Sequence, residues 1–531
     1  MVPITKDDHA AQAKYELERV LLDGELRQLL IGETFVATLS HQDWELSVEW
    51  GKLIFAWWDE EHSQNWRVTA YEVDPVEVRL RVTRGLAHQT SVLTLRNPVK
   101  SRAIGERKNL SPREKRERYA PLLAGLLTTF FIGLRVQSST TGADRARSVP
   151  GRFARLILQL NQEKILAIGV NEGESQSDID RIIAAGLIWL AGFNPGREPK
   201  MRANRLWFCL PRGRSRTAIE RVTFIDASCF DARIECFEID ERNEELVAVR
   251  PTTQAELCHA RPHELRWPGN PLTASHWSER ILSLAPELIE IRQRPGSEGQ
   301  SFSINGLEFA RVISGEDGRV EFGVAVSAKT GSMPNRSILN ESNFSHLRGL
   351  AHEIIKFRSI DSPDRRHPLY RLRAETWLES LLRREIGILD ATLDDRFVYS
   401  QIPTWRADER SVIDLLTLNR NGRLVVIEIK TAEDLQLPLQ GLDYWLRIEQ
   451  ARLRQEFERR GLFIGARIAD QSPLLYLVAP RLRFHRTFAV VARCLASSVE
   501  AYRIGINSNW RDGIHVHSRE RINRQDWKAI G

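Results

Sequence analysis

Cysteine is scarce in this sequence, with five residues in a chain of 531, and no two of them form a CxxC pair. Disulfide frameworks are dense in cysteine, and zinc ribbons and iron–sulfur clusters usually take thiols from CxxC pairs, so few and scattered cysteines argue against all three classes. A thiol outside such a motif usually behaves as a small buried hydrophobic group. We therefore expect five free, buried thiols in a reducing compartment: Cys209, Cys229, Cys236, Cys258 and Cys494.

Long hydrophobic segments are absent as well. The longest apolar run, Pro121–Leu134, is too short to span a bilayer, and it lacks the position and cleavage site of a signal peptide. The sequence also contains no GxxxxGK[ST] motif, which argues against a P-loop helicase domain. We expect a cytoplasmic protein that does not contact a membrane.

Length and charge limit the possible architectures and partners. A chain of 531 residues exceeds what one hydrophobic core organises, and it predicts three or four domains of about 150 residues each. Hydrophobic residues make up 42% and charged residues 27%, which is typical of a folded globular chain. The net charge of +6 and the pI of about 9.1 fit a polyanionic partner but do not identify one.

The hydrophobic period changes near residue 31. Residues 1–30 carry apolar residues at helical spacing and predict an amphipathic helix. Residues 31–98 contain six short β-prone runs, which predict a small antiparallel barrel or sandwich. Its tryptophans either fill the core, which we favour, or stack on nucleic-acid bases: Trp44, Trp50, Trp57, Trp58 and Trp66.

Two less regular segments separate the expected domains. Residues 99–118 are rich in Lys and Arg and predict a basic linker, and contact with phosphates and a solvated helix remain equally open interpretations. Residues 266–366 contain strand-like pieces followed by a helix, which predicts an α+β middle region. The segment 362–368 is expected to be a linker, and the last domain covers 367–531.

The last domain contains charged residues inside otherwise apolar strands. A helix carrying Glu375 and Glu379, one turn apart, precedes a strand with Asp414. An Asn-Gly turn then returns the chain as LVVIEIK, where Glu428 and Lys430 are two residues apart and so share one face of the strand. A buried carboxylate without a partner is costly, and a bound Mg²⁺ or Mn²⁺ removes that cost.

An ion pair between Glu428 and Lys430 at the rim of a sheet is the alternative interpretation, and for an isolated ExK sequence it is the better one. Asp414 one hairpin upstream, together with the helices on either side, favours a metal site instead. Glu433 and Asp434, just before the second helix, either hold a second metal ion or cap that helix, and we favour the cap.

These residues resemble the PD-(D/E)XK nuclease superfamily, whose core is an αβββαβ unit. Asp414 matches the first metal ligand of that family, and the triplet from Glu428 to Lys430 matches its (D/E)XK motif. The resemblance covers Arg371–Ala479, with Ile413 in place of a common proline. The helix LPLQGLDYW is similar to the RecB-type QxxxY motif through Gln440 and Tyr444.

The resemblance implies a Mg²⁺- or Mn²⁺-dependent nuclease that acts on nucleic acid, with DNA the favoured substrate, in repair or defence. It implies that Asp414 and Glu428 hold the metal and that Lys430 assists the attacking water. Gln440 and Tyr444 are implied to contact the phosphate backbone or steady the site. Glu375 matches the supporting glutamate of the first helix, with Glu379 as the alternative.

An internal repeat lies upstream. Residues 152–170 align without a gap on residues 411–429, which places Arg155 at Asp414, Gly169 at Glu428 and Asn171 at Lys430. Gly186 with Gly441 and Pro211 with Pro480 continue the parallel. Residues 119–265 are therefore expected to be a nuclease-like copy without a metal site. This copy would bind DNA, with Arg155 contributing to affinity, or act as an internal pseudo-dimer partner; a homodimer is the other possibility.

The sequence thus predicts a multidomain α/β (α+β) protein. It would have a restriction-endonuclease-like αβββαβ core at 367–531, a degenerate copy of that core at 119–265 and a small antiparallel β domain near the amino terminus. Two other functions remain open. One is a non-catalytic nucleic-acid-binding or scaffold protein that keeps the nuclease fold, and the other is a nuclease that acts only when the middle region senses a ligand or partner.

Overall fold

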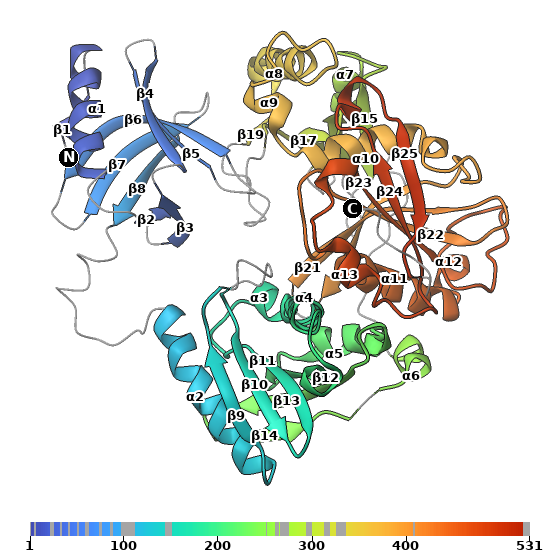
Figure 1. Cartoon of the computed structure of the whole chain (residues 1–531). Coiled ribbons are helices and arrows are strands. Elements are labelled where there is room, and N and C mark those ends of the chain that lie inside the picture. Colours follow the sequence, from blue (N-terminus) through green and yellow to red (C-terminus); the bar gives the residue numbers. More distant parts are fainter. Residues whose placement is uncertain are drawn as a thin grey trace. The chain divides into compact units, whose positions relative to one another are not determined.

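Two compact units divide the chain in the computed structural model, and each is formed by two separate stretches of sequence. Figure 1 labels their helices and strands. The first unit comprises Met1–Asn109 and Asn270–Ala374, and the second comprises Leu110–Gly269 and Glu375–Gly531. The structure describes the following residues: 2–4, 7–21, 26–31, 34–40, 43–49, 52–58, 63–73, 77–84, 89–96, 112–143, 151–250, 252–260, 265, 276–293, 300–312, 319–324, 336–406 and 409–523.

The amino-terminal part of the first unit is one antiparallel sheet covered by helix α1 (Asp7–Leu21). Ala10, Ala13, Leu17 and Leu21 of this helix are buried, and α1 contacts β4, β5 and β6. The strand order is β3-β2-β8-β7-β6-β5-β4, with β1 paired to β6. The strands are β1 (Val2–Pro3), β2 (Leu26–Ile31), β3 (Thr34–Ser40), β4 (Trp44–Glu49), β5 (Lys52–Trp58), β6 (Ser63–Val73), β7 (Glu77–Arg84) and β8 (Gln89–Arg96).

The helix expected over residues 1–30 is shorter than predicted. It ends at Leu21, and Leu26–Ile31 form strand β2, because this segment satisfies its backbone by pairing with both β3 and β8. The predicted burial of the tryptophans is confirmed for three of them: Trp44, Trp57 and Trp66. Trp50 and the side chain of Trp58 lie outside the described residues.

The other part of the first unit contains a five-stranded antiparallel sheet in sequential order. Its strands are β15 (Ile289–Gln293), β16 (Gln300–Ile304), β17 (Leu307–Val312), β18 (Val320–Phe322) and β19 (Ser337–Ile338). Its helices are α7 (His276–Leu282), α8 (Phe344–Phe357) and α9 (Pro368–Arg371). The unit extends to Ala374, past the expected boundary at 366, because the buried guanidinium of Arg358 donates hydrogen bonds to the carbonyls of Leu369, Leu372 and Arg373.

The second unit contains two six-stranded sheets of the same design. Each has strands in sequential order, with antiparallel, antiparallel, parallel, parallel and antiparallel neighbours. The upstream half (Leu110–Gly269) contains β9 (Arg135–Thr140), β10 (Ala154–Leu160), β11 (Glu163–Gly169), β12 (Ala203–Pro211), β13 (Arg233–Asp240) and β14 (Glu245–Ala248). The downstream half (Glu375–Gly531) contains β20 (Tyr399–Arg406), β21 (Glu409–Leu418), β22 (Leu424–Ile429), β23 (Leu474–Pro480), β24 (Glu500–Ile506) and β25 (Val516–Arg521).

The helices of the two halves occupy matching places in the chain. One helix precedes each sheet, a second connects the third and fourth strands, and a third follows the fourth strand. The upstream helices are α2 (Pro112–Phe130), α3 (Gln176–Asp180), α4 (Ile182–Phe193), α5 (Arg216–Thr223) and α6 (Gln254–His259). The downstream helices are α10 (Ala374–Arg384), α11 (Leu437–Leu453), α12 (Glu456–Arg459) and α13 (Phe488–Ala492). No helix among the described residues combines the length and apolar character needed to cross a membrane.

Equivalent glycines support the repeat at the level of single residues. A Cβ added at Gly186 in α4 would lie 2.5 Å from Phe208, and one added at Gly441 in α11 would lie 2.6 Å from Leu477. Phe208 and Leu477 stand three residues before Pro211 and Pro480, the last residues of β12 and β23. In both halves a glycine therefore lets the connecting helix approach the same place on the sheet.

The gapless alignment of the repeat is wrong by one residue after the hairpin turn. Upstream, Leu160 pairs with Glu163 and encloses Asn161 and Gln162, whereas downstream the N–H of Asn419 donates to the carbonyl of Arg423 and encloses residues 420–422. The downstream turn is therefore one residue longer. The pairing with the next strand shows which residues correspond. Ile168 pairs with Phe208 on β12, and Glu428 pairs with Leu477, the equivalent of Phe208, on β23. Ile168 and Val170, not Gly169 and Asn171, thus correspond to Glu428 and Lys430.

The two halves pack against each other through equivalent elements. Helix α5 contacts α11, and the equivalent pair, α13 and α4, is also in contact. An isolated antiparallel bridge joins Ile225, which follows α5, to Leu495, which follows α13. Arg221 donates two hydrogen bonds to Asp443, at 2.8 and 3.0 Å, and Arg447 pairs with Glu220 at 2.5 Å. All four of these charged side chains are buried.

The expectation of five buried thiols is confirmed for Cys209, Cys236 and Cys494. Cys258 is partly buried. Cys229 is exposed, contrary to expectation, because it lies in a short surface 3-10 helix, η3 (Ala227–Phe230), rather than in a strand of the core.

Substitution of Arg221 with Met should destabilise the packing of the two halves by about 3–5 kcal/mol, because the buried carboxylate of Asp443 loses the guanidinium that compensates it. Hydrogen exchange of the α5 and α11 amides gives this free energy. The double variant Arg221→Met with Asp443→Leu should recover part of the loss. Lys200→Met, which removes a pair that is 80% and 70% exposed, is the control and should change little. An unchanged exchange rate in Arg221→Met contradicts the prediction.

Candidate active site

The acidic and basic residues singled out in the sequence converge at one end of the downstream sheet. Asp414 lies on β21 and Glu428 on the adjacent strand β22, and Asp414 Oδ2 accepts a hydrogen bond of 2.8 Å from the N–H of Ile429. Lys430 follows β22, and its N–H donates to the carbonyl of Val478 on β23 at 2.9 Å. Its Nζ lies 3.1 Å from Glu428 Oε1. The hairpin and the parallel strand thus bring all three side chains to one place.

Helix α10 contributes two glutamates near these three side chains, Glu375 and Glu379. Glu375, in the first turn, places Oε2 3.9 Å from Lys430 Nζ, and its Oε1 accepts from the N–H of Thr431 at 3.4 Å. The side chain of Glu375 is 41% exposed, whereas Glu379 is fully buried. Both charges act on Asp414, but it is Glu375 that contacts Lys430.

Helix α11 brings Gln440 and Tyr444 beside the acids. Gln440 Nε2 donates to the hydroxyl of Tyr444 at 3.0 Å, and the ring of Tyr444 is buried. Burial and the charge of Glu428 raise the pKa of Tyr444, so its phenol stays neutral. Asp434 Oδ1 accepts from the N–H of Gln436 at 2.7 Å. Gln436 itself is the N-cap residue of α11, and no side chain among the described residues caps this helix, so the cap expected from Glu433 or Asp434 is wrong.

Gln401 is a neighbour of the site that sequence reasoning missed. It lies on β20 between Ser400 and Ile402, which pair with Leu415 and Ile413, so it faces Asp414 across the ladder. Its φ of 54° is unusual for a residue other than glycine, and its Nε2 lies 3.5 Å from Asp414 Oδ1. No feature of the sequence signals this backbone conformation.

The charges in the site are not balanced within the protein. Burial, and then the charge of Glu375, raise the pKa of Asp414 to about 7, although Lys430 acts in the opposite direction. Burial and the charge of Asp414 raise the pKa of Glu428 well above its ordinary value. Burial would lower the pKa of Lys430, but the surrounding carboxylates outweigh it and raise that pKa. One ammonium group therefore compensates two carboxylates that water does not reach freely.

The donor set fits a divalent cation. Glu428 Oε2 is buried and has no hydrogen-bond partner, while Oε1 is engaged by Lys430. Asp414 and Glu428 stand on neighbouring strands, and Mg²⁺ is commonly bound by one or two carboxylates with water and substrate oxygens completing its coordination. Within the described ranges no group of three or more His, Cys, Asp or Glu side chains is placed to hold a metal ion.

The corresponding place in the upstream half contains no acid. Arg155 pairs across the hairpin with Ile168, as expected for equivalents of Asp414 and Glu428. The guanidinium of Arg155 is buried, donates to the carbonyl of Gly142 and lies 5.7 Å from the ring centre of Trp189, the equivalent of Tyr444. The charge of Arg155 is thus directed into the protein, and its contribution to DNA affinity stays a prediction.

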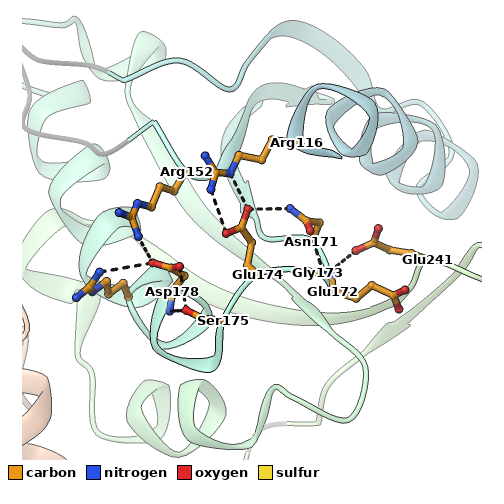
Figure 2. Close-up of polar contacts among 10 residues, drawn as sticks. Arg116, Arg152, Asn171, Glu172, Gly173, Glu174, Ser175, Asp178 and Glu241 are labelled. Atoms are coloured by element: carbon orange, nitrogen blue, oxygen red, sulfur yellow. Dashed lines mark hydrogen bonds and ion pairs between the residues drawn. The ribbon is translucent and has the colours of Figure 1, made fainter. Parts of the chain in front are cut away.

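The loop after β11 contains an ion pair with helix α2 (Figure 2). Arg116 of α2 donates to both carboxylate oxygens of the buried Glu174, at 2.6 and 3.0 Å, and Asn171 donates to Glu174 at 3.3 Å. Arg116 belongs to the predicted basic linker 99–118, of which residues 112–118 form the start of α2; residues 99–111 lie outside the described residues. The guanidinium of Arg116 thus pairs with a carboxylate of the protein.

Neither a protein-family model nor a curated protein matches this chain. The candidate site is therefore identified by the positions and contacts of its own residues.

Asp414→Asn should stabilise the protein by about 1–3 kcal/mol at pH 8 in the absence of divalent cations. The folded protein raises the pKa of the Asp414 carboxyl to about 7, so its ionised form is unfavourable in the fold, and the substitution removes that charge. A carboxyl whose pKa is raised by folding binds its proton more tightly in the folded protein than in the unfolded one. Wild-type stability should therefore rise as the pH falls from about 7 toward 4, and the advantage of the variant should shrink. Thermal unfolding in EDTA across this range measures both effects.

The matched control is Asp240→Asn, since Asp240 is a carboxylate whose pKa is lowered by hydrogen bonds from Asn243 and which therefore benefits from being ionised. This control should not stabilise the protein at pH 8. Equal or lower stability of Asp414→Asn at pH 8 is the outcome that contradicts the charge imbalance.

Proposed function

We propose that this protein is a Mg²⁺- or Mn²⁺-dependent deoxyribonuclease of the PD-(D/E)XK type, with its active site in the downstream half. The observation that carries the proposal is the convergence of Asp414, Glu428 and Lys430, in which two carboxylates share one ammonium group and one buried oxygen has no partner. The order α10-β20-β21-β22-α11-β23 supports a restriction-endonuclease-like αβββαβ core. The net charge of +6 is in keeping with a polyanionic substrate.

Asp414 and Glu428 would hold the cation. When bound, a divalent cation supplies Lewis acidity toward a phosphate oxygen and makes a coordinated water more acidic. Lys430 keeps its proton, because its pKa is raised, so it acts as a fixed positive charge that stabilises the developing negative charge on the phosphate. This role differs from that of a base that deprotonates water.

The remaining side chains hold these three in position. Glu375 faces the ammonium of Lys430 from the more exposed side, where a substrate would enter. Gln440 lies on the same helix as Tyr444 and is partly exposed, so its amide is available to a phosphate oxygen. Gln401 is placed to orient Asp414 through its amide nitrogen.

For the upstream half we propose a structural role. Its equivalents of the active residues are Arg155, Ile168 and Val170, which offer no ligand for a cation. Arg221 and Glu220 instead bind Asp443 and Arg447 on α11, the helix that carries Gln440 and Tyr444. The upstream half thus helps to hold α11 in position.

Lys430→Ala should lower the rate of DNA cleavage by at least about 100-fold, because a fixed charge aimed at the reacting phosphate contributes on this scale. The assay uses single-stranded, duplex and branched DNA, and RNA, each with Mg²⁺ or Mn²⁺. Lys200→Ala, which removes an exposed lysine of the upstream half, is the control and should cleave at the wild-type rate.

A wild-type protein that cleaves none of these substrates with either cation contradicts the nuclease assignment. If it still binds DNA, a non-catalytic nucleic-acid-binding protein becomes the better assignment.

Glu428→Gln should abolish binding of Mn²⁺ measured by calorimetry, because the amide keeps the size of the side chain but removes the anionic donor. The protein should release protons when it binds the ion near pH 7, since the pKa of Asp414 is about 7 without it. Glu174→Gln, in the loop after β11 of the upstream half, is the matched control and should leave Mn²⁺ binding intact. Persistence of the binding isotherm in Glu428→Gln argues against this site.

A further inference from the structure

Two thiols from the two halves of the second unit lie face to face. Cys229 belongs to η3 in the upstream half, and Cys494 follows α13 in the downstream half. Their sulfur atoms are 3.4 Å apart, although the residues are separated by 265 positions in the sequence. The pair plays no part in the candidate active site.

The backbone holds the two thiols together. Ile225 and Leu495 form an antiparallel bridge, the N–H of Asp226 donates to the carbonyl of Cys494 at 2.7 Å, and the N–H of Ala496 donates to the carbonyl of Phe224 at 2.8 Å. These bonds fix the segments on which both cysteines stand. The sulfur atoms therefore remain neighbours without the need for a conformational change.

The two thiols differ in their environment. Cys229 is exposed, and the hydrogen bond with Cys494 together with the charge of Arg493 lowers its pKa. Arg493 is held in place over the ring of Phe230 at 4.2 Å. Cys494 is fully buried, and burial raises its pKa. One partner is thus open to reagents and the other is protected, which is the arrangement expected of a reacting thiol and a resolving thiol.

We propose that Cys229 and Cys494 form a reversible disulfide that links the upstream and downstream halves when the protein meets a hydroperoxide. The Cys229 thiolate attacks the O–O bond of hydrogen peroxide, takes one oxygen to become a sulfenic acid, and hydroxide leaves. The sulfur of Cys494 then attacks the sulfur of Cys229, and the displaced hydroxide takes up the thiol proton as water. Two thiols and one H₂O₂ give one disulfide and two H₂O, so the sulfur atoms lose the two electrons that the peroxide gains.

The geometry requires only a small adjustment. A disulfide bond is about 2.05 Å long, so the sulfur atoms must approach by about 1.3 Å from their separation of 3.4 Å. Rotation of the Cys229 side chain on its exposed side can supply this change. The backbone hydrogen bonds of the bridge can stay in place.

The other cysteines are poor competitors for the oxidant. Cys209 and Cys236 are buried within the upstream sheet, and burial raises the pKa of both thiols. Cys258 is partly buried, and burial raises its pKa to about 11. These three thiols are mostly protonated at neutral pH and react slowly with peroxide. The proposed disulfide is therefore selective for one pair.

Closing this bond would tie together two segments far apart in the chain. A cross-link restricts the unfolded chain more strongly when the enclosed loop is long, and here it also joins the two halves at their contact. We expect the oxidised protein to unfold at a higher temperature than the reduced one, and dithiothreitol to reverse the difference.

The test treats the full-length protein with hydrogen peroxide near pH 7.5 and identifies the products by peptide mass spectrometry without reduction. The expected result is a peptide pair joined through Cys229 and Cys494, a loss of two free thiols, and an increase in the thermal midpoint. Cys229→Ser should lose all three changes, while Cys258→Ser, the matched control, should keep them. Cys494→Ala serves as the second variant and should trap sulfenic acid at Cys229, which dimedone detects.

Three outcomes overturn the proposal. The first is overoxidation of Cys229 while Cys494 stays a free thiol in the wild-type protein, and the second is a disulfide that involves Cys258. The third is a cross-link only between separate chains, seen as a dimer on non-reducing gels. None of these measurements depends on nuclease activity, so the proposed function and this inference can fail separately.

Discussion

Two carboxylates share one ammonium group at the end of the downstream sheet, and this imbalance sets the requirements for the surrounding structure. Asp414 and Glu428 can be neighbours only because they stand on adjacent strands of one hairpin, and Lys430 can reach Glu428 only from the same strand face. Folding thus holds a charge arrangement that is unfavourable in itself. The stability of the rest of the sheet must offset that cost.

The upstream half has the same sheet design but no carboxylates at the positions of Asp414 and Glu428. Arg155 lies beside Trp189, Ile168 and Val170 replace the acid and the lysine, and Arg116 pairs with Glu174 in the loop after β11. Arg155 here donates to a backbone carbonyl, and Glu174 has a partner of opposite sign. The two halves thus share one backbone design but differ in their charges at this place: Arg155 donates to a carbonyl upstream, whereas Glu428 Oε2 has no partner downstream.

The parts that the sequence predicts well are those that depend on local periodicity. Glu428 and Lys430 share a strand face because of the pleat, and Gln440 and Tyr444 share a helix face because of their spacing of four. Long-range pairing was harder to foresee. The one-residue shift of the repeat depends on the length of a turn, Gln401 faces Asp414 through a left-handed backbone conformation, and Leu26–Ile31 become a strand because two other strands pair with them.

The contact between the halves combines similar backbones with unlike side chains. Helices α4 and α11 are equivalent, so Ile188 and Gly192 stand where α11 has Asp443 and Arg447. The pair α5 with α11 is consequently charged, while the pair α4 with α13 is packed through apolar residues. Two copies of the upstream half could not form the charged part of this contact. In such a pair, Glu220 and Arg221 of α5 would face Gly192 and Ile188 of the other copy instead of Arg447 and Asp443. Divergence of the repeat thus makes each half specific for the other, since self-association would leave buried charges uncompensated.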